Sequence, residues 1–293
     1  MDELATKISL YQNRIISYTY RLTGSIEDAQ DITQETMLKY INAKTQNIKN
    51  TKAWMFKVAT NLYLDFIKSS KNKKEVYKGS WLPDPFIKYE YSMEEEIELD
   101  ESLSMALLVL MEKLPIKEKI VYILNDIFDF SHNETANILN TSTQNSRQLS
   151  SRANKKLQVS KKRFTPTKEE HEELTNSFLI AAKKGDFNHL QKIFSEELIF
   201  ISDGGKKAKS AQKIISGNRA VSIFIIKIIS KSFLRDANDM IIKKVWFNGS
   251  FGFIILYKQK IISSFNFEIN DGKITGIFVL RNPDKLKFLE KNY

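Results

Sequence analysis

The sequence predicts a multidomain protein in which two all-α domains are followed by an α+β domain with a curved antiparallel sheet. Apolar residues recur at helical spacing through much of residues 1–163, and a segment with two closely spaced prolines interrupts them. After Pro166, strand-like runs alternate with the hairpin signals Asn248-Gly249 and Asp271-Gly272. These observations divide the chain into residues 1–75, 76–100, 101–164 and 165–293.

Composition excludes several classes of protein. The chain has 293 residues and a formal net charge of +10, which suits a polyanionic partner. It has no cysteine and only three scattered histidines, so we expect no disulfide, no metal site and no cofactor. No apolar run is long enough to span a membrane, and the first residues lack the layout of a signal peptide. We therefore expect a cytoplasmic protein without membrane contact.

Residues 1–75 are expected to form three helices. Gly24 and Ser25 separate the first two, and the polar loop 42–51 separates the second from the third. Each helix carries an apolar stripe, so Trp54 is assigned to the core and not to a binding surface. The stripes are Ile8, Tyr11, Ile15 and Tyr18; Ala29, Ile32, Met37 and Ile41; and Trp54, Val58, Leu62 and Phe66.

The second of these helices should carry a polar, mostly acidic face. Asp31 follows Asp28 by three residues, and Gln34 and Glu35 follow Asp31 by three and four, which places all four on one side of a helix. Such a face can be a docking surface for a basic partner, but on an arbitrary helix it is more often simply solvated.

Residues 76–100 are expected to be a linker. The motif WLPDP at residues 81–85 holds two prolines that favour an extended backbone. Residues 81–100 contain seven acidic side chains and one basic side chain, and the acidic run Glu94–Asp100 suits the start of a helix.

Residues 130–157 predict a helix-turn-helix. Ser131 and Glu134 form a capping box, and Asn140 suits the left-handed residue that ends the first helix. The second helix would fit the DNA major groove, where Arg147 and Arg152 could contact either bases or phosphates. Its exposed residues are expected to be Gln144, Asn145, Arg147, Gln148, Ser151 and Arg152.

Beyond Pro166, two helices at about 168–184 and 186–195 precede the strands. The strand-like runs are LIFIS, DMIIKKVWF, SFGFIILYK, KIISSFNFEI and KITGIFVLR. Helices followed by antiparallel strands indicate a separate α+β domain.

Three segments give the first 163 residues a resemblance to the extracytoplasmic-function (ECF) sigma factors of bacterial RNA polymerase. SIEDAQDITQETMLKYI (residues 25–41) looks like the helix that grips the polymerase clamp, and AWMFKVATNLYLDFIK (53–68) like the helix after the promoter-melting loop. LPIKEKIVYILNDIFDFSHNETANIL (114–139) matches the pattern of region four. Their order and spacing together are specific to this family.

Further motifs resemble the subgroup of these sigma factors that carries a fused SnoaL-like domain. They are WLPDP, the recognition-helix segment QNSRQLSSRA (144–153), DGG (203–205) and NPDKL (282–286). The chain departs from the pattern at Lys206, where another glycine is usual, and at Lys119, Asn125 and Asn154, where arginine is usual. The resemblance implies sigma region 2 at 1–75, sigma region 4 at 101–164 and a SnoaL-like cone at 165–293.

The resemblance also implies partners and site residues. The partners are core RNA polymerase, double-stranded promoter DNA and the non-template single strand. Polymerase binding is assigned to Asp28, Asp31, Gln34 and Glu35. DNA binding is assigned to Asn47, Lys49 and Asn50 in the loop and to Gln144, Asn145, Arg147, Gln148, Ser151 and Arg152. A regulatory interface is assigned to Trp81, Pro83, Asp203, Gly204, Gly205, Asn282, Pro283 and Asp284.

Two other functions remain open from the sequence: a ligand-sensing DNA-binding regulator without polymerase docking, and a SnoaL-like isomerase or cyclase tethered to DNA. An enzyme would need a positioned acid–base group, and Asp203 with Tyr257 is a weak pair for that role. We therefore expect no catalytic residue. The last domain could hold a small-molecule ligand of unknown identity, and the free chain is expected to be a monomer.

Overall fold

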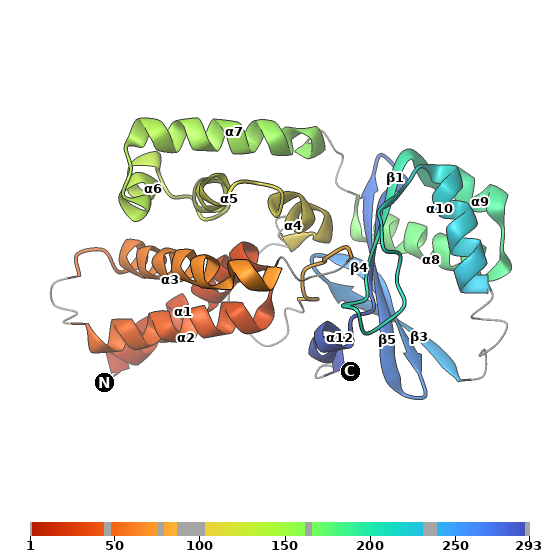
Figure 1. The fold of residues 1–293 in the computed structure, drawn as a ribbon, viewed down its shortest axis with the longest axis horizontal. Helices are drawn as coiled ribbons and strands as arrows, with labels where there is room; N and C mark the ends of the chain where they lie inside the picture. The colour runs from red at the N-terminus through yellow and green to blue at the C-terminus, as the bar shows by residue number, and fades with distance from the viewer. Residues whose placement is uncertain are drawn as a thin grey trace. The chain divides into compact units, whose positions relative to one another are not determined.

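The computed structural model describes residues 2–43, 48–74, 79–86, 103–161, 166–230 and 239–290. These residues fall into two compact units (Figure 1). The first contains residues 2–74 and 110–161. The second contains residues 79–86, 103–109, 166–230 and 239–290. The linker motif and the segment 103–109 therefore belong to the unit that contains the sheet.

Three helices begin the first unit: α1 (Asp2–Thr23), α2 (Ile26–Asn42) and α3 (Thr51–Lys74). Ser25 caps α2, since its hydroxyl accepts a 3.3 Å hydrogen bond from the Asp28 amide. The predicted stripe of α2 is buried at Ala29, Ile32 and Met37, whereas Ile41 remains 48% exposed. The prediction that Ile41 belongs to the core is therefore wrong: in the last turn of α2 the buried position is taken by Tyr40, which is 2% exposed, and Ile41 lies on the solvent side.

The rest of the first unit is the predicted helix-turn-helix and the helix before it. Its elements are α5 (Ile116–Tyr122), the π-helix η4 (Ile123–Ile127), α6 (His132–Leu139) and α7 (Thr143–Lys161). The capping box of Ser131 and Glu134 is confirmed, and these hydrogen bonds lower the pKa of Glu134. Asn140 adopts the predicted left-handed conformation with φ of 50°.

An aromatic cluster joins the two helical segments. The ring of Phe128 lies 5.6 Å from that of Tyr18 and 5.1 Å from that of Phe56, and Phe130 lies 4.9 Å from Phe56. Aromatic rings at 4.5–7 Å in tilted or edge contacts stabilise one another. The segments predicted as two helical domains thus form one unit.

The second unit is an α+β domain, as the sequence predicts. Its sheet has the strand order β2-β1-β6-β5-β4-β3. The neighbours pair antiparallel, except that β1 and β6 are parallel, so the sheet is mixed and not purely antiparallel. The strands are β1 (Phe194–Asp203), β2 (Ile215–Ser216), β3 (Met240–Phe247), β4 (Ser250–Tyr257), β5 (Lys260–Asn270) and β6 (Lys273–Leu280). The two predicted hairpin turns are present, and Asn248 and Asp271 each have φ of 49°.

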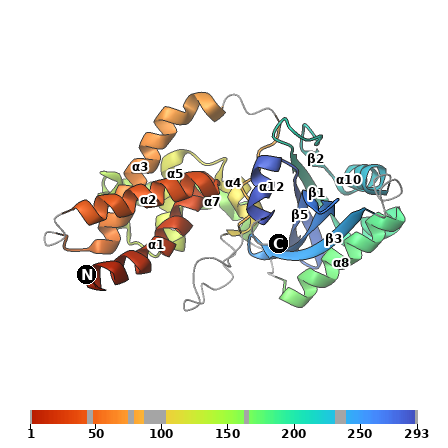
Figure 2. The same ribbon diagram turned by 90° about the horizontal axis from the view of Figure 1, so that it is seen from below.

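Each face of this sheet is covered by a separate core. On one face lie α8 (Lys168–Lys184), α9 (Phe187–Ile193) and α10 (Asn218–Ile225), which continues into the π-helix η5 (Ile226–Ser230). On the other face lie α12 (Pro283–Glu290), the first turns of α4 (Met105–Met111) and Leu82 of the linker. Figure 2 shows α8 and α12 beside the sheet. The second face is thus buried by segments that come from before the domain as well as from its end.

Candidate functional site

Asp203, at the end of β1, holds the linker by its buried carboxylate. Its side chain is fully buried, and Oδ2 accepts a 3.0 Å hydrogen bond from the Leu82 amide. Oδ1 accepts a 3.0 Å bond from the Gly205 amide, and its backbone carbonyl accepts from the amides of Arg281 and Asn282 at 2.7 and 3.0 Å. One residue therefore joins the linker, the loop after β1 and the segment after β6.

Lys285 of α12 completes this contact, and we call the pair Asp203 and Lys285 the linker latch. The Lys285 ammonium lies 3.0 Å from Asp203 Oδ2 and also donates to the Leu82 carbonyl. It sits 4.4 Å from the centre of the Trp81 ring, a cation–π arrangement. The ion pair thus satisfies both backbone groups of Leu82, whose side chain is completely buried in the core.

The two glycines of DGG are required by close packing. A Cβ on Gly205 would lie 2.3 Å from the Asn282 side chain, and the residue has φ of +56°. A Cβ on Gly204 would lie 2.2 Å from the Ala208 carbonyl. The motif therefore allows the loop after β1 to approach the segment that begins α12.

The residues of NPDKL have different roles: some begin α12, and others form ion pairs. Asn282 caps α12 through a 3.1 Å bond from the Asp284 amide to its Oδ1, and Pro283 is the first helical residue. Asp284 is exposed and pairs with exposed Lys207 at 2.7 Å. Lys285, which the sequence analysis did not select, makes the linker contact. The sequence held one signal for this role of Lys285. A lysine in the first turn of a helix lies at the positive end of the helix dipole, which is unfavourable unless the side chain has an anionic partner.

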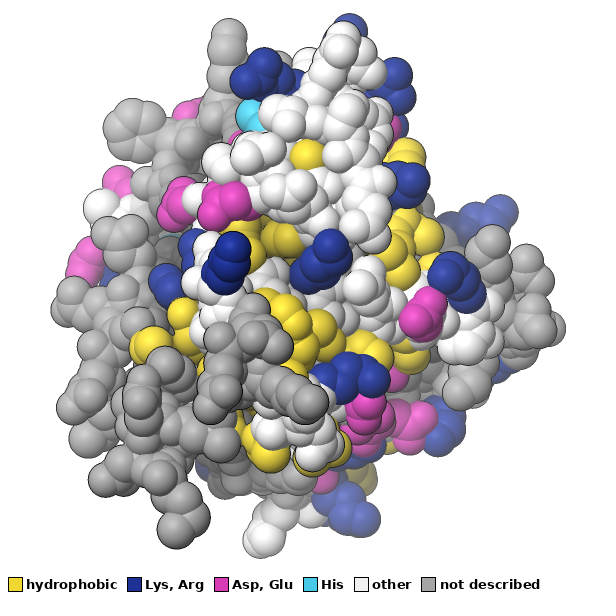
Figure 3. Space-filling view, turned by 90° about the vertical axis from the view of Figure 1, so that its left-hand side faces the viewer, with side chains coloured by type: hydrophobic (Ala, Val, Ile, Leu, Met, Phe, Trp, Pro, Cys, Tyr) yellow, Lys and Arg dark blue, Asp and Glu magenta, His cyan; other side chains and the backbone are white. Residues whose placement is uncertain are grey.

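In the first unit, α2 presents the predicted polar surface. Asp31, Gln34 and Glu35 are exposed, whereas Asp28 is half-buried beside the cap. Leu38 is 53% exposed and, with Ile41, adds an apolar part to this surface that was not predicted as a binding surface. Figure 3 shows hydrophobic side chains exposed among Lys, Arg, Asp and Glu on one face of the molecule. A mixed acidic and apolar surface suits a protein partner with basic and apolar side chains.

The loop before α3 is described only in part. Asn47 lies outside the described residues, and Lys49 and Asn50 are exposed. Asn50 Oδ1 accepts a 2.9 Å bond from the Ala53 amide, so this side chain caps α3 as well as facing solvent. Farther along α3, Lys52 donates to the Phe128 carbonyl and Lys57 to Asn140 Oδ1, each at 3.2 Å.

Helix α7 carries the predicted DNA-binding face. A buried stripe of Leu149, Ala153 and Leu157 fixes the helix on its unit. The opposite side exposes Gln144, Arg147, Gln148, Ser151 and Arg152. Asn145 differs from these residues, because it is half-buried and its Nδ2 donates a 2.7 Å bond to Thr141 Oγ1 in the turn. The helix thus offers donors and acceptors of the kinds that contact base edges and phosphates.

The cone of the second unit is filled by aromatic rings. The ring of Phe178 is stacked against that of Phe253, with centres 6.1 Å apart, and makes an edge contact with that of Phe267 at 5.0 Å. His171 is also buried there; burial lowers its pKa, and Nε2 lies 3.2 Å from the Phe267 carbonyl. Among the described residues, no group of His, Asp and Glu is arranged to hold a metal ion.

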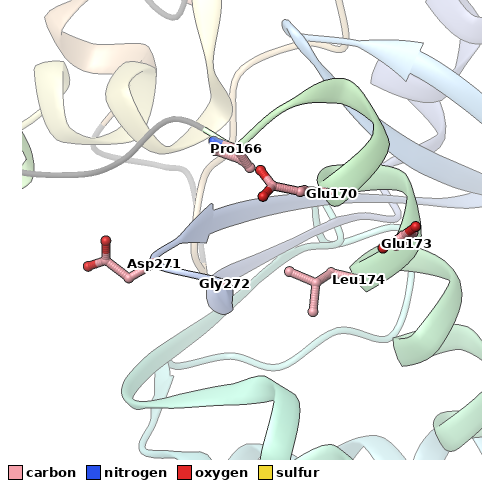
Figure 4. A pocket seen from close by; sticks show the side chains of 6 residues that line it. All are labelled: Pro166, Glu170, Glu173, Leu174, Asp271 and Gly272. Atoms are coloured by element: carbon pink, nitrogen blue, oxygen red, sulfur yellow. The ribbon is translucent and has the colours of Figure 1, made fainter.

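An open hollow of about 350 Å³ lies on the surface between the start of α8 and the β5–β6 turn (Figure 4). Glu170 at its rim is engaged in a capping box, since it accepts a 2.8 Å bond from the Thr167 amide. The hollow is lined by Pro166, Glu170, Glu173, Leu174, Asp271 and Gly272.

In the parts of the chain with described positions, no helix is long and apolar enough to cross a membrane.

Two protein families match the chain. Sigma-70 region 2 matches residues 8–73, and Sigma-70, region 4 matches residues 104–157. The first match covers most of α1, all of α2 and nearly all of α3, and the second begins just before α4 and ends within α7.

Whole proteins resemble the chain over almost its full length. The ECF RNA polymerase sigma factor SigJ of Mycobacterium tuberculosis is 27% identical over 286 residues, which cover 94% of this chain and 90% of SigJ. Probable ECF RNA polymerase sigma factor SigI of the same organism is 23% identical, with 97% and 95% covered. The crystal structure of SigJ aligns with a TM-score of 0.76 at 25% identity and covers 97% of this chain and 98% of SigJ. The similarity therefore includes the second unit.

Proposed function

We propose a division of work among the surfaces of this chain, which belongs to the ECF sigma factors of RNA polymerase. The chain is a sigma factor that directs core RNA polymerase to specific promoters for transcription initiation.

Helix α2 docks on the core polymerase. Its exposed acidic side chains Asp31 and Glu35 would pair with basic groups, while Leu38 and Ile41 would lose exposed apolar surface on binding. Asp28, which is half-buried, contributes at the edge of this surface.

DNA is contacted at two places in the first unit. Gln148, Arg147 and Arg152 of α7 read the upstream promoter element in the major groove, and the exposed Lys49 and Asn50 face the non-template strand. The observation that carries this assignment is the exposed polar face of α7 above its buried apolar stripe.

The second unit regulates the sigma regions through the linker. Because the linker latch holds both backbone groups of Leu82, the linker cannot leave the domain at this point without breaking two hydrogen bonds to a buried ion pair. The domain acts without catalysis of its own, since its only buried histidine among the described residues is bonded to a backbone carbonyl. As a partner of core polymerase, the chain works in the cytoplasm.

The test is transcription by purified core polymerase with the full-length chain on a library of promoters. Arg147→Ala should reduce discrimination at one base position by about 1–3 kcal/mol, whereas loss of a phosphate contact would weaken all promoters alike. Asn137→Ala, on the exposed side of α6, is the matched control and should leave output unchanged. Output from Arg147→Ala and Arg152→Ala equal to wild type on every promoter would remove α7 as the reader.

A further inference from the structure

Asn248, in the turn between β3 and β4, is almost completely buried although a turn residue is normally exposed. It is 1% exposed and has φ of +49°. Its backbone N–H donates a 3.0 Å hydrogen bond to the Phe86 carbonyl, and its side-chain Oδ1 accepts a 3.0 Å hydrogen bond from the backbone N–H of Phe86. Its Nδ2 donates a 3.3 Å bond to the Leu103 carbonyl. One residue therefore binds the chain at two places far apart in the sequence.

Turn chemistry alone does not explain these contacts. Asn-Gly is favoured in tight hairpins because both residues adopt positive φ. Asp271 has the same φ of 49° in the β5–β6 turn, yet it is exposed. Asn266 of β5 also holds this turn in place, since its Nδ2 donates a 3.1 Å hydrogen bond to the Phe247 carbonyl. The β3–β4 turn is thus built into the domain and directed at the linker.

The two segments that Asn248 holds are the end of the linker and the approach to α4. Phe86 directly follows WLPDP, and Leu103 lies two residues before Met105, which begins α4. Met105 and Ala106 pack in the same core as Leu82 on the second face of the sheet. Since the region 4 match begins at residue 104, its first residues are attached to the second unit and not to the first.

We propose that Asn248 is a positioning residue that fixes where region 4 departs from the C-terminal domain. The linker latch holds the chain before the two prolines of WLPDP, and Asn248 holds it after them and again at the start of α4. Region 4 then stays tied to the domain even when the latch at Leu82 opens. This inference rests on the proposed function of the chain as a sigma factor.

The chemistry requires an amide side chain at this position. Oδ1 must accept a hydrogen bond from a backbone amide while Nδ2 donates one to a backbone carbonyl. A carboxylate in its place can accept but cannot donate. Asn248→Asp therefore keeps a partner for the Phe86 amide and loses the donor for Leu103. Asn248→Gly loses both side-chain bonds and still permits the left-handed turn.

Amide hydrogen exchange of the full-length chain tests the contact itself. In Asn248→Gly, we expect the Phe86 amide and the amides of residues 105–109 to exchange about fivefold faster, since each lost hydrogen bond is worth roughly 1 kcal/mol. The Leu82 amide, held by Asp203, should keep its wild-type rate. Asp271→Gly makes the same replacement in the exposed turn and should change none of these rates. Wild-type exchange at residues 86 and 105–109 in Asn248→Gly would overturn the proposal.

Transcription with core polymerase gives the second readout. Asn248→Gly and Asn248→Asp should both change promoter output, whereas only Asn248→Gly should speed exchange at Phe86. Faster exchange with unchanged output in both variants would overturn the positioning role. If the wild-type chain directed no transcription at all, the proposed function would fail, while the exchange result would still report on the contact.

Discussion

Helix α7 and the linker latch differ in whether the residues proposed to act in function also support the fold. The functional side chains of α7 project into solvent, and the helix is set in place by other residues such as Leu149 and Ala153. In the latch, Asp203 and Lys285 are themselves buried, so the groups that make the contact also support the fold. Substitutions on α7 should therefore change recognition alone, whereas substitutions in the latch should change stability and regulation together.

Breaking the latch should give the largest effect. Lys285→Met leaves the Asp203 carboxylate buried without its counter-ion, a change that typically costs about 3–5 kcal/mol. We expect a reduction of this size in the unfolding free energy of the second unit, measured by urea denaturation of the full-length chain, with faster exchange of the Leu82 amide.

The neighbouring ion pair is a matched control. Asp284 precedes Lys285 in the same motif, but its pair with Lys207 is more than half exposed on both sides. Asp284→Asn should therefore change the unfolding free energy by about 0–1 kcal/mol. Equal losses in the two variants would show that burial does not distinguish the two pairs.

The sequence predicted α7 well and the latch only in part, because the two depend on contacts of different range. The capping box of Ser131 and Glu134 and the left-handed Asn140 lie within a few residues of one another, so local patterns reveal them. The Asp203 contact with Leu82 joins residues 121 positions apart. The motifs indicated that these segments matter, but periodicity cannot show which side chain in NPDKL turns toward the linker.

Substitutions on the α2 surface should give the next largest effect. As on α7, we expect them to weaken binding without lowering stability. Asp31→Lys with Glu35→Lys reverses two exposed charges, and breaking charge pairs at an interface costs about 2–5 kcal/mol of binding. We expect weaker binding to core polymerase in a competition assay, with an unchanged melting temperature. Asp65→Lys, an exposed acid on α3, is the control. Wild-type binding by the double variant would exclude α2 as the docking surface.

Two neighbouring residues near the start of α7 allow a finer comparison. Gln148 is exposed, whereas the Asn145 amide is bonded within the turn to Thr141. Gln148→Ala should lower base discrimination by about 1–3 kcal/mol without loss of stability. Asn145→Ala should instead destabilise the turn by roughly 1 kcal/mol and leave base preference intact. Promoter-library selection beside thermal melting separates them, and a changed base preference in Asn145→Ala would return this residue to the reading surface.

The tertiary contacts of Asn248 could not be predicted from the sequence. Asn-Gly is fully explained by the hairpin, so nothing in the local pattern indicates that its side chain binds Phe86 and Leu103. The mixed sheet has a similar cause. β1 pairs with β6 in parallel, and strand partners so far apart in the chain leave no local signal of direction. In both cases a tertiary contact uses a residue or strand whose local role is already complete.

The smallest expected effect is a pH dependence confined to the second unit. Burial lowers the pKa of His171, so the folded state favours the neutral ring, whereas the unfolded chain binds a proton near the ordinary pKa of about 6.5. The stability that this histidine contributes is therefore complete above about pH 6.5 and declines as the pH falls toward the lowered pKa. His171→Gln keeps an amide that can donate to the Phe267 carbonyl but cannot titrate in this range. Melting of its second unit should depend less steeply on pH than in wild type, while His132→Gln in the first unit should keep the wild-type slope for that transition. Equal slopes in wild type and His171→Gln would assign the acid sensitivity of the domain to other groups.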